Sequence, residues 1–130
     1  MSFQQVINCV REFHNSFKIE NKEVPTAQVD RDTLMLRYKL MREENEEYLE
    51  AAENGDLIEI ADALGDMLYI LCGTILSHGM QDKIEEVFRE IQRSNMSKLD
   101  KNGEPIYRED GKVLKSDQYF KPDIGSILSK

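Results

Sequence analysis

The stretch EIADALGDMLYIL, residues 59–71, decides how this chain folds and raises its central question. Its apolar residues are those of a buried helix, yet it also carries Glu59, Asp62 and Asp66 at spacings of three and four residues. Carboxylates inside an apolar helix are unfavourable unless a cation, a hydrogen bond or a change of protonation compensates them. Another part of the chain, or a bound cation, must therefore neutralise these three acids.

The three acids form a narrow stripe on the expected helix. At about 100° per residue they fall within roughly 60° of one another, and Tyr69 and Gly73 continue the stripe. A solvated helix face is usually wide and of mixed sign, whereas this stripe contains no Lys or Arg. The pattern favours a functional site over a solvated stripe, which is the alternative. The opposite side of the helix is apolar, and we expect it to be packed: Leu57, Ala61, Leu64, Leu68, Leu71 and Ile75.

Four helices are predicted from apolar spacing and cap signals, at about residues 3–18, 30–53, 57–78 and 83–95. Asp56 and Gly79 bound the third helix, and Gly55 suits a cap after the second. Asp82 and Glu85 form a capping-box pattern at the start of the fourth. Short connections between such helices favour antiparallel neighbours.

The pattern changes after the fourth helix. PIYREDGKVLK, residues 105–115, contains a DG pair between short mixed runs, which predicts a hairpin with a two-residue turn. YFKPDIGSILSK, residues 119–130, is expected to be extended. The predicted fold class is therefore all-α, a four-helix bundle with a short C-terminal hairpin and extended tail. We expect a single domain over 1–130, with a helical body at about 1–95 and the hairpin and tail at 96–130.

Composition excludes several classes of protein. The chain has 130 residues and a formal net charge of -8, which disfavours DNA, RNA and anionic membrane surfaces as partners. Residues 57–80 are long enough to cross a bilayer, but their three carboxylates argue against a membrane span. The N-terminal residues do not have the pattern of a secretory signal. The two cysteines, Cys9 and Cys72, are expected to be reduced thiols, so we expect a cytoplasmic protein. Phe13 and Phe17 are expected in the core rather than as a base-stacking surface.

Six glutamates of the second helix sort into two groups. One group shares a sector with Lys39 and Arg42 and predicts exposed i,i+4 ion pairs: Glu46, Glu50 and Glu53. The other group lies on the apolar side of the helix, beside Leu36, Leu40 and Ala51: Glu43, Glu44 and Glu47. An ordinary charged face is the alternative reading of the second group, and only its combination with the acids of the next helix favours a site.

Antiparallel packing of the second and third helices would let Glu44 and Glu47 meet Glu59 and Asp62. Facing carboxylates cannot all stay ionised without cations, and oxygen ligands with no His or Cys nearby favour Mg²⁺ or Mn²⁺ over zinc. Glu59 has a competing role as the third residue of a capping box that begins at Asp56. Both roles of Glu59 stay open from the local pattern.

The basic residues are distributed unevenly along the chain. Residues 96–130 hold seven Lys and Arg against six Asp and Glu, which gives +1 there and leaves -9 for residues 1–95. Lys98, Lys112 and Lys115 would individually be surface lysines. As a group near an acidic site, they are candidates for contacts with phosphate oxygens.

These motifs together resemble a known family. EENEE at residues 43–47 followed by EIAD at 59–62 resembles the paired EExxE and ExxD signature of the all-α nucleoside triphosphate pyrophosphohydrolases, which include MazG-like proteins, dimeric dUTPases and phosphoribosyl-ATP pyrophosphohydrolases. SNMSK at 94–98 and the tail sequence GKVLKSDQYFKPDI resemble the phosphoribosyl-ATP pyrophosphohydrolase-like subgroup. The resemblance implies a MazG-like helical bundle that assembles as a homodimer or homotetramer. It also implies Mg²⁺-dependent cleavage of a nucleoside triphosphate between its α- and β-phosphates.

Site residues follow from the resemblance position by position. Metal is expected at Glu44, Glu47, Glu59 and Asp62. Glu43 either completes that shell or acts as base on the attacking water, a role for which Glu47 is the other candidate. Substrate binding is expected at Asp66, Asn95 and Lys98, and the charge pattern, not the resemblance, adds Lys112 and Lys115 as phosphate contacts. One departure weakens assignment as a dUTPase: only eleven residues, 48–58, connect the motifs, too few for the helix that some dimeric dUTPases insert.

The resulting hypothesis is a Mg²⁺-dependent nucleoside triphosphate pyrophosphohydrolase that removes unwanted nucleotides from the pool. One alternative is a phosphoribosyl-ATP pyrophosphohydrolase of histidine synthesis. The other is a non-catalytic helical module for oligomerisation or metal binding that has kept the fold without turnover.

Overall fold

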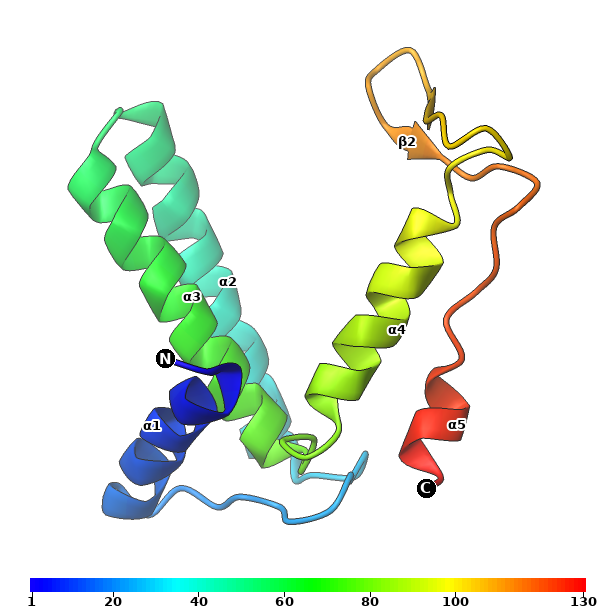
Figure 1. Cartoon of the computed structure of the whole chain (residues 1–130). Coiled ribbons are helices and arrows are strands. Elements are labelled where there is room, and N and C mark those ends of the chain that lie inside the picture. Colours follow the sequence, from blue (N-terminus) through cyan, green and yellow to red (C-terminus); the bar gives the residue numbers. More distant parts are fainter. The chain divides into compact units, whose positions relative to one another are not determined.

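A computed structural model describes all residues, 1–130, and it is mainly helical (Figure 1). The helices are α1 (Phe3–Ser16), α2 (Arg31–Glu53), α3 (Leu57–Ser77), α4 (Ile84–Met96) and α5 (Ile124–Leu128). The strands are β1 (Ile106–Tyr107) and β2 (Val113–Leu114). The predicted all-α class and all four predicted helices are confirmed, each within two residues of its expected ends. The chain divides into two compact units, Met1–Asp82 and Lys83–Lys130. One domain over the whole chain stays a prediction.

Local signals place the α2–α3 connection where the sequence predicts it. Asp56 is the N-cap of α3, and its side chain accepts a hydrogen bond from the Glu59 backbone N–H at 3.1 Å. Gly55 has a φ of +63°, a left-handed conformation that glycine adopts without strain, and its N–H donates to the Ala52 carbonyl after the last turn of α2. This short connection leaves α2 and α3 as antiparallel neighbours (Figure 1).

The core of the first unit lies where α1 packs against the C-terminal half of α3 (Figure 1). Ile7 and Val10 of α1 and Cys72 and Leu76 of α3 are almost completely buried. Hydrophobic burial of this kind is the main stabilising contribution to such a small unit. The expectation that the phenylalanines of α1 join this core is wrong, because Phe13 is 40% exposed and the Phe17 side chain, just after the helix, is 66% exposed.

Two polar side chains, one from α1 and one from α2, are buried beside this core. His14 of α1 is 2% exposed, and its Nδ1 lies 2.6 Å from Oδ1 of Asn21. Arg37 of α2 is also buried, and it donates hydrogen bonds to the Ile70 carbonyl at 2.8 Å and to Oγ1 of Thr74 at 3.0 Å. These bonds hold α2 against the C-terminal half of α3.

The apolar side of α3 is less buried than its sequence predicts. Four leucines of that side form an exposed leucine row: Leu57, Leu64, Leu68 and Leu71. Ile75, on the same side of α3, is buried as expected. Leu36, on the apolar side of α2, is about half exposed, like the leucines of the row. The expectation of a fully packed side is therefore wrong within one chain. The physical reason is that α1 covers only the C-terminal part of α3, while α2 covers a different side.

The length and composition of α3 also meet the requirements of a membrane span. Residues Leu57–Ser77 include a window with a mean hydropathy of 1.4. One helix of this kind is weak evidence, because the core helix of a soluble protein passes the same test. The absence of a membrane partner therefore stays a prediction.

The second unit, Lys83–Lys130, begins with α4 and differs from the prediction at the start of that helix. The N-cap is Lys83, in a near-helical conformation and without a side-chain cap bond. The predicted capping box of Asp82 and Glu85 is therefore wrong, since the chain already turns through residues 81–83 before the helix begins.

The hairpin of the second unit is confirmed, but its loop is longer than predicted. Strands β1 and β2 pair antiparallel, with Tyr107 opposite Val113. The Arg108 N–H donates to the Lys112 carbonyl at 2.8 Å, so three residues rather than two form the turn. Gly111, the last of these, has a φ of +89°. The DG pair thus fits a three-residue loop with glycine in the left-handed conformation.

The tail ends in a short helix instead of remaining extended throughout. Asp123 is the N-cap of α5, and its side chain accepts from the Ser126 backbone N–H. The Asp123 N–H donates to the Glu90 carboxylate of α4 at 2.7 Å. Arg93 first, and then this N–H, lower the pKa of Glu90 to about 2. The expectation of an extended tail is wrong for these residues because the cap and the contact with α4 stabilise one short helical segment.

Candidate functional site

The acids of α2 and α3 lie together between the two antiparallel helices. Glu44 of α2 is close enough to Glu47, Asp62 and Asp66 for each of their charges to act on its carboxyl group. Helical spacing puts the acids of each helix on one side, and the short α2–α3 connection turns these two sides toward each other. We call these four residues the acid cluster: Glu44, Glu47, Asp62 and Asp66. Of the juxtaposition expected from the sequence, the approach of Glu44 to Asp62 is present, while Asp66 takes part and Glu59 is not among the charges that act on Glu44.

Glu44 is the member of the acid cluster that its surroundings affect most. Its Oε2 atom is buried and has no hydrogen-bond partner. Burial, together with the neighbouring Glu47 carboxylate and the charges of Asp66 and Asp62, raises the pKa of Glu44 to about 7. A buried carboxylate oxygen without a partner is unfavourable. Glu44 therefore either holds a proton or requires a cation.

Asp66 belongs to the same cluster. Its pKa is raised, first by burial and then by the charges of Asp62 and Glu47. The sequence suggested that Asp66 borders the substrate, and the structure also places it among the acids expected to hold metal. At this position Asp66 can border the substrate, and it can also contribute to a metal site.

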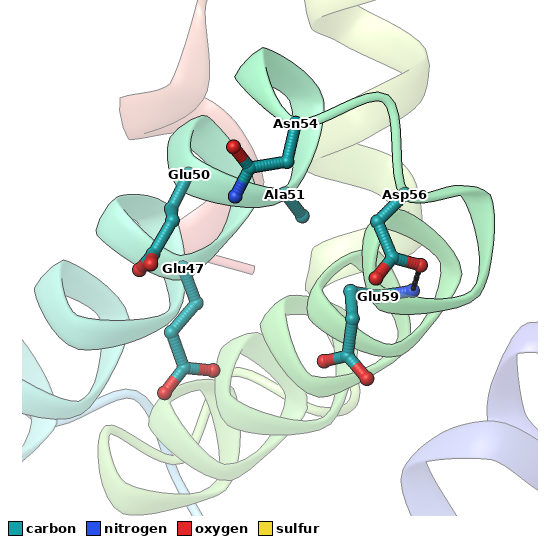
Figure 2. Close-up of a pocket in the computed structure, with 6 residues that line it drawn as sticks. All are labelled: Glu47, Glu50, Ala51, Asn54, Asp56 and Glu59. Carbon is teal, nitrogen blue, oxygen red and sulfur yellow. Dashed lines mark hydrogen bonds between the residues drawn. The ribbon is translucent and has the colours of Figure 1, made fainter.

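A pocket of about 300 Å³ opens beside the acid cluster, at the end of the α2–α3 pair. Figure 2 shows the carboxylates of Glu47 and Glu59 on opposite sides of this opening, one from each helix. Four of the six lining residues carry carboxylates, and the full lining is Glu47, Glu50, Ala51, Asn54, Asp56 and Glu59. Glu47 is therefore shared between the pocket and the acid cluster.

The two possible roles of Glu59 are separated by the hydrogen bonds around Asp56. The Asp56 side chain accepts from the Glu59 N–H, which is the first half of a capping box. The second half would need the Asp56 N–H to donate to the Glu59 carboxylate, but this N–H donates to the Ala51 carbonyl at 3.0 Å. The Glu59 carboxylate is therefore not used as a cap and lies at the pocket (Figure 2).

Besides Ala51, three polar lining residues were not predicted as part of a site: Glu50, Asn54 and Asp56. Glu50 was expected to form an exposed ion pair, but only Arg42 and Glu46 pair in that sector, at 3.1 Å. The signal in the sequence that could have identified them was the short α2–α3 connection, which brings the last turn of α2 next to the first turn of α3.

Glu43, in contrast, is exposed on α2 and is not among the charges that act on Glu44. Its role stays a prediction.

The candidate substrate residues outside the acid cluster belong to the second unit. Asn95 lies in the last turn of α4, and the Lys98 carbonyl just beyond that helix accepts from the Ser116 N–H at 3.2 Å. Lys112 lies at the base of the hairpin loop and is exposed. Lys115 has its Nζ 4.7 Å from the centre of the Tyr119 ring. Their part in substrate binding stays a prediction.

The donors of the acid cluster and pocket suit a hard divalent cation. All are oxygens, with no His or Cys among them, as Mg²⁺ and Mn²⁺ prefer. The unpartnered Oε2 of Glu44 is the donor that such an ion would satisfy. No three acid, His or Cys side chains already stand at ligand distance from one point. Binding would therefore draw the carboxylates toward the ion.

Comparison with known proteins adds one finding. A family model described as phosphoribosyl-ATP pyrophosphohydrolase matches residues 10–95. The matched range contains the acid cluster, the pocket and Asn95, and it ends before the three candidate lysines. No curated protein matches the chain.

Proposed function

This chain belongs to the phosphoribosyl-ATP pyrophosphohydrolase family, and we propose that it hydrolyses a nucleoside triphosphate between the α- and β-phosphates. Membership of the family indicates a pyrophosphohydrolase that acts on a nucleotide. The products of the proposed reaction are a nucleoside monophosphate and pyrophosphate. Removal of unwanted nucleotides in the cytoplasm is the role that we propose for it.

One observation carries this proposal: the acid cluster contains a buried, unpartnered carboxylate oxygen of Glu44 among three further acids. A structural role gives no reason to collect these charges between two helices, since like charges destabilise their packing. A metal-dependent phosphoryl-transfer site does give a reason to collect these charges, because divalent ions neutralise both the acids and the phosphate oxygens.

We assign metal binding to Glu44, Glu47, Glu59 and Asp62, with Mg²⁺ as the ion and Mn²⁺ as a substitute. A bound ion would neutralise charge on the triphosphate and activate the attacking water. Glu47 or Glu43 would accept the proton of that water, which requires the carboxylate to lie within hydrogen-bond reach of it.

The phosphates that the ion leaves free need cationic or hydrogen-bonding partners. Lys98, Lys112 and Lys115 provide ammonium donors for the departing pyrophosphate. Asn95 contributes an amide, and Asp66 borders the nucleotide beside the acid cluster. We also propose a homodimer or homotetramer, supported by the exposed leucine row of α3.

The test is pyrophosphate release from a panel of ribo- and deoxyribonucleoside triphosphates and phosphoribosyl-ATP, with and without Mg²⁺. Glu47→Gln and Asp62→Asn are expected to lower kcat/KM by at least about 100-fold. The matched control is Glu53→Gln, an exposed glutamate in the last turn of α2 that lines no pocket. Full activity in both site variants would show that the site is misplaced.

The second candidate function is hydrolysis of phosphoribosyl-ATP itself, and the description of the matched family favours it directly. The same panel separates the two, because the true substrate has the highest kcat/KM. If wild-type protein releases pyrophosphate from no member of the panel, a non-catalytic helical module is the better description.

A further inference from the structure

Three aromatic side chains form a small exposed cluster on the first unit, which we call the aromatic platform: Phe13, Phe17 and Tyr69. The ring centres of Phe13 and Phe17 lie 4.4 Å apart with an angle of 32° between the rings. Phe13 meets Tyr69 edge to face, with ring centres 5.7 Å apart. The three side chains are 40%, 66% and 42% exposed, respectively. The rings therefore contact one another while a large part of their surface stays exposed.

The aromatic platform lies in line with the acid cluster on α3. Tyr69 continues the stripe formed by Asp62 and Asp66, and on an ideal helix it lies within about 20° of the direction of Asp62. Seven residues at 1.5 Å each separate the two along the axis by about 10 Å. This length is comparable to the reach of a nucleotide from its base, across the sugar, to its first phosphates.

We propose that the aromatic platform stacks the base of the nucleotide whose phosphates lie at the acid cluster. This inference rests on the proposed function and adds the place and chemistry of base recognition. A base is flat, uncharged and aromatic, so it suits open rings, whereas the phosphates need the metal-binding acids. Stacking on aromatic side chains tolerates every base, because each has a π-face.

The chemistry of the platform also predicts its selectivity. Phe13 and Phe17 present no hydrogen-bond donors or acceptors to the edge of a base. The Tyr69 hydroxyl is the one polar group of the three rings. The platform is therefore expected to hold purines more tightly than pyrimidines through their larger stacked area, with little discrimination among purines.

The test is equilibrium binding in the presence of Mg²⁺, with two probes compared by calorimetry. One probe is α,β-methylene-ATP, which resists hydrolysis and carries adenine, a base shared by ATP and phosphoribosyl-ATP. The other is inorganic tripolyphosphate, which has no base. Phe17→Leu and Tyr69→Leu are expected to raise the Kd of α,β-methylene-ATP about tenfold and to leave that of tripolyphosphate unchanged. Tyr69→Phe keeps the ring and should bind both probes as wild type does.

The matched control is Tyr38→Leu, because Tyr38 is an exposed aromatic residue of α2 outside the platform. It should change neither Kd. An unchanged Kd for α,β-methylene-ATP in both platform variants overturns the proposal. An equal rise in the Kd of both probes also overturns the proposal, because the rings then support the site without touching the base. A loss of oligomers in the same variants would overturn it too, because the rings would then be a contact between copies.

Failure of the proposed hydrolysis gives a different result from failure of the platform. If wild-type protein binds α,β-methylene-ATP through the platform but cleaves no triphosphate, base stacking stands and the hydrolytic assignment fails. If it cleaves triphosphates and the platform variants bind normally, the hydrolytic assignment stands and the base lies elsewhere.

Discussion

The two halves of α3 are built from similar apolar residues but differ in burial. From Cys72 to Ser77 every residue except Thr74 is buried, whereas from Leu57 to Leu71 the one buried residue is Ala63. The closed half packs against α1 and receives the hydrogen bonds of Arg37. The open half carries the acid cluster, the Glu59 side of the pocket and the leucine row.

This difference teaches that stability and chemistry are supplied by separate parts of one helix. The closed half buries its side chains within the chain and so can hold α3 in place by itself. The open half combines acids that repel one another with leucines that the chain does not cover. Cations would neutralise these acids and a second copy would cover these leucines, and we propose both a bound divalent ion and an oligomer for this chain.

The largest expected effect on the free energy of unfolding comes from truncating a leucine in the closed half and comparing it with the same truncation in the open half. Leu76→Ala, at a fully buried position, is expected to lower the free energy of unfolding by about 2–5 kcal/mol. Leu64→Ala, at a position that is 52% exposed, should lower it by less than about 1 kcal/mol. Urea denaturation followed by circular dichroism at several protein concentrations measures both.

An equal loss in the two leucine variants would contradict the burial pattern of a single chain. If the wild-type midpoint also rises with protein concentration, the leucine row is covered by another copy in solution. The comparison would then hold for the isolated chain and disappear in the assembly.

The second test uses the two glycines of α3. A Cβ at Gly73 would clash with Nη2 of Arg37 and lie 3.0 Å from Nε2 of His14, whereas a Cβ at Gly65 meets no atom within 4 Å. Gly73→Ala is expected to destabilise the protein by about 1–3 kcal/mol, because Arg37 would have to give up its buried hydrogen bonds. Gly65→Ala should stabilise it by about 0.5–1 kcal/mol through the helix propensity of alanine.

Thermal unfolding of the two glycine variants measures these opposite signs. A neutral Gly73→Ala would mean that the Arg37 side chain can move at no cost. Its bonds to α3 would then contribute little to the closed half.

Local features of this fold could be predicted from the sequence because their causes are local. The cap at Asp56 and the turn at Gly55 depend on a few neighbouring residues, and both are present. The meeting of Glu44 and Glu47 with the acids of α3 was also predictable, since a three-residue connection leaves α2 and α3 few arrangements other than antiparallel. The helical spacing of the acids in α2 and in α3, together with the short loop between these helices, was sufficient for this prediction.

Other features depend on what covers a residue, and sequence periodicity does not contain that information. It identified the leucine row as apolar but could not show that nothing in the chain packs on it. The same limit explains Phe13 and Phe17, which were expected in the core. Asn54 and Glu50 became pocket residues only once the ends of two helices were placed side by side.

The third test compares the starts of two helices. Asp56→Ala removes the side chain that accepts from the Glu59 N–H at the start of the open half, and it should cost about 0.5–2 kcal/mol. Asp82→Ala should change stability by no more than about 0.5 kcal/mol, because α4 has no side-chain cap bond. Chemical denaturation of both variants checks the pair, and a cost at Asp82 similar to that at Asp56 would show that Asp82 caps α4 in solution.

The smallest expected effect is the pH dependence of the open half, because Glu44 is only partly buried. Its pKa rises from 4.5 to about 7 on folding, so the folded protein binds this proton more tightly than the unfolded chain. The stability from Glu44 is therefore complete below about pH 4.5 and is lost as the pH rises through about 7. Added Mg²⁺ should reverse this trend, since it binds the ionised carboxylates and stabilises the folded state more at high pH. Glu44→Gln should reduce the decline seen without metal between about pH 5 and 7, to which Asp66 also contributes because its pKa is raised, whereas Glu53→Gln should leave the decline unchanged. A decline that persists unchanged in Glu44→Gln would assign the titration to another group and separate Glu44 from the proposed cation site.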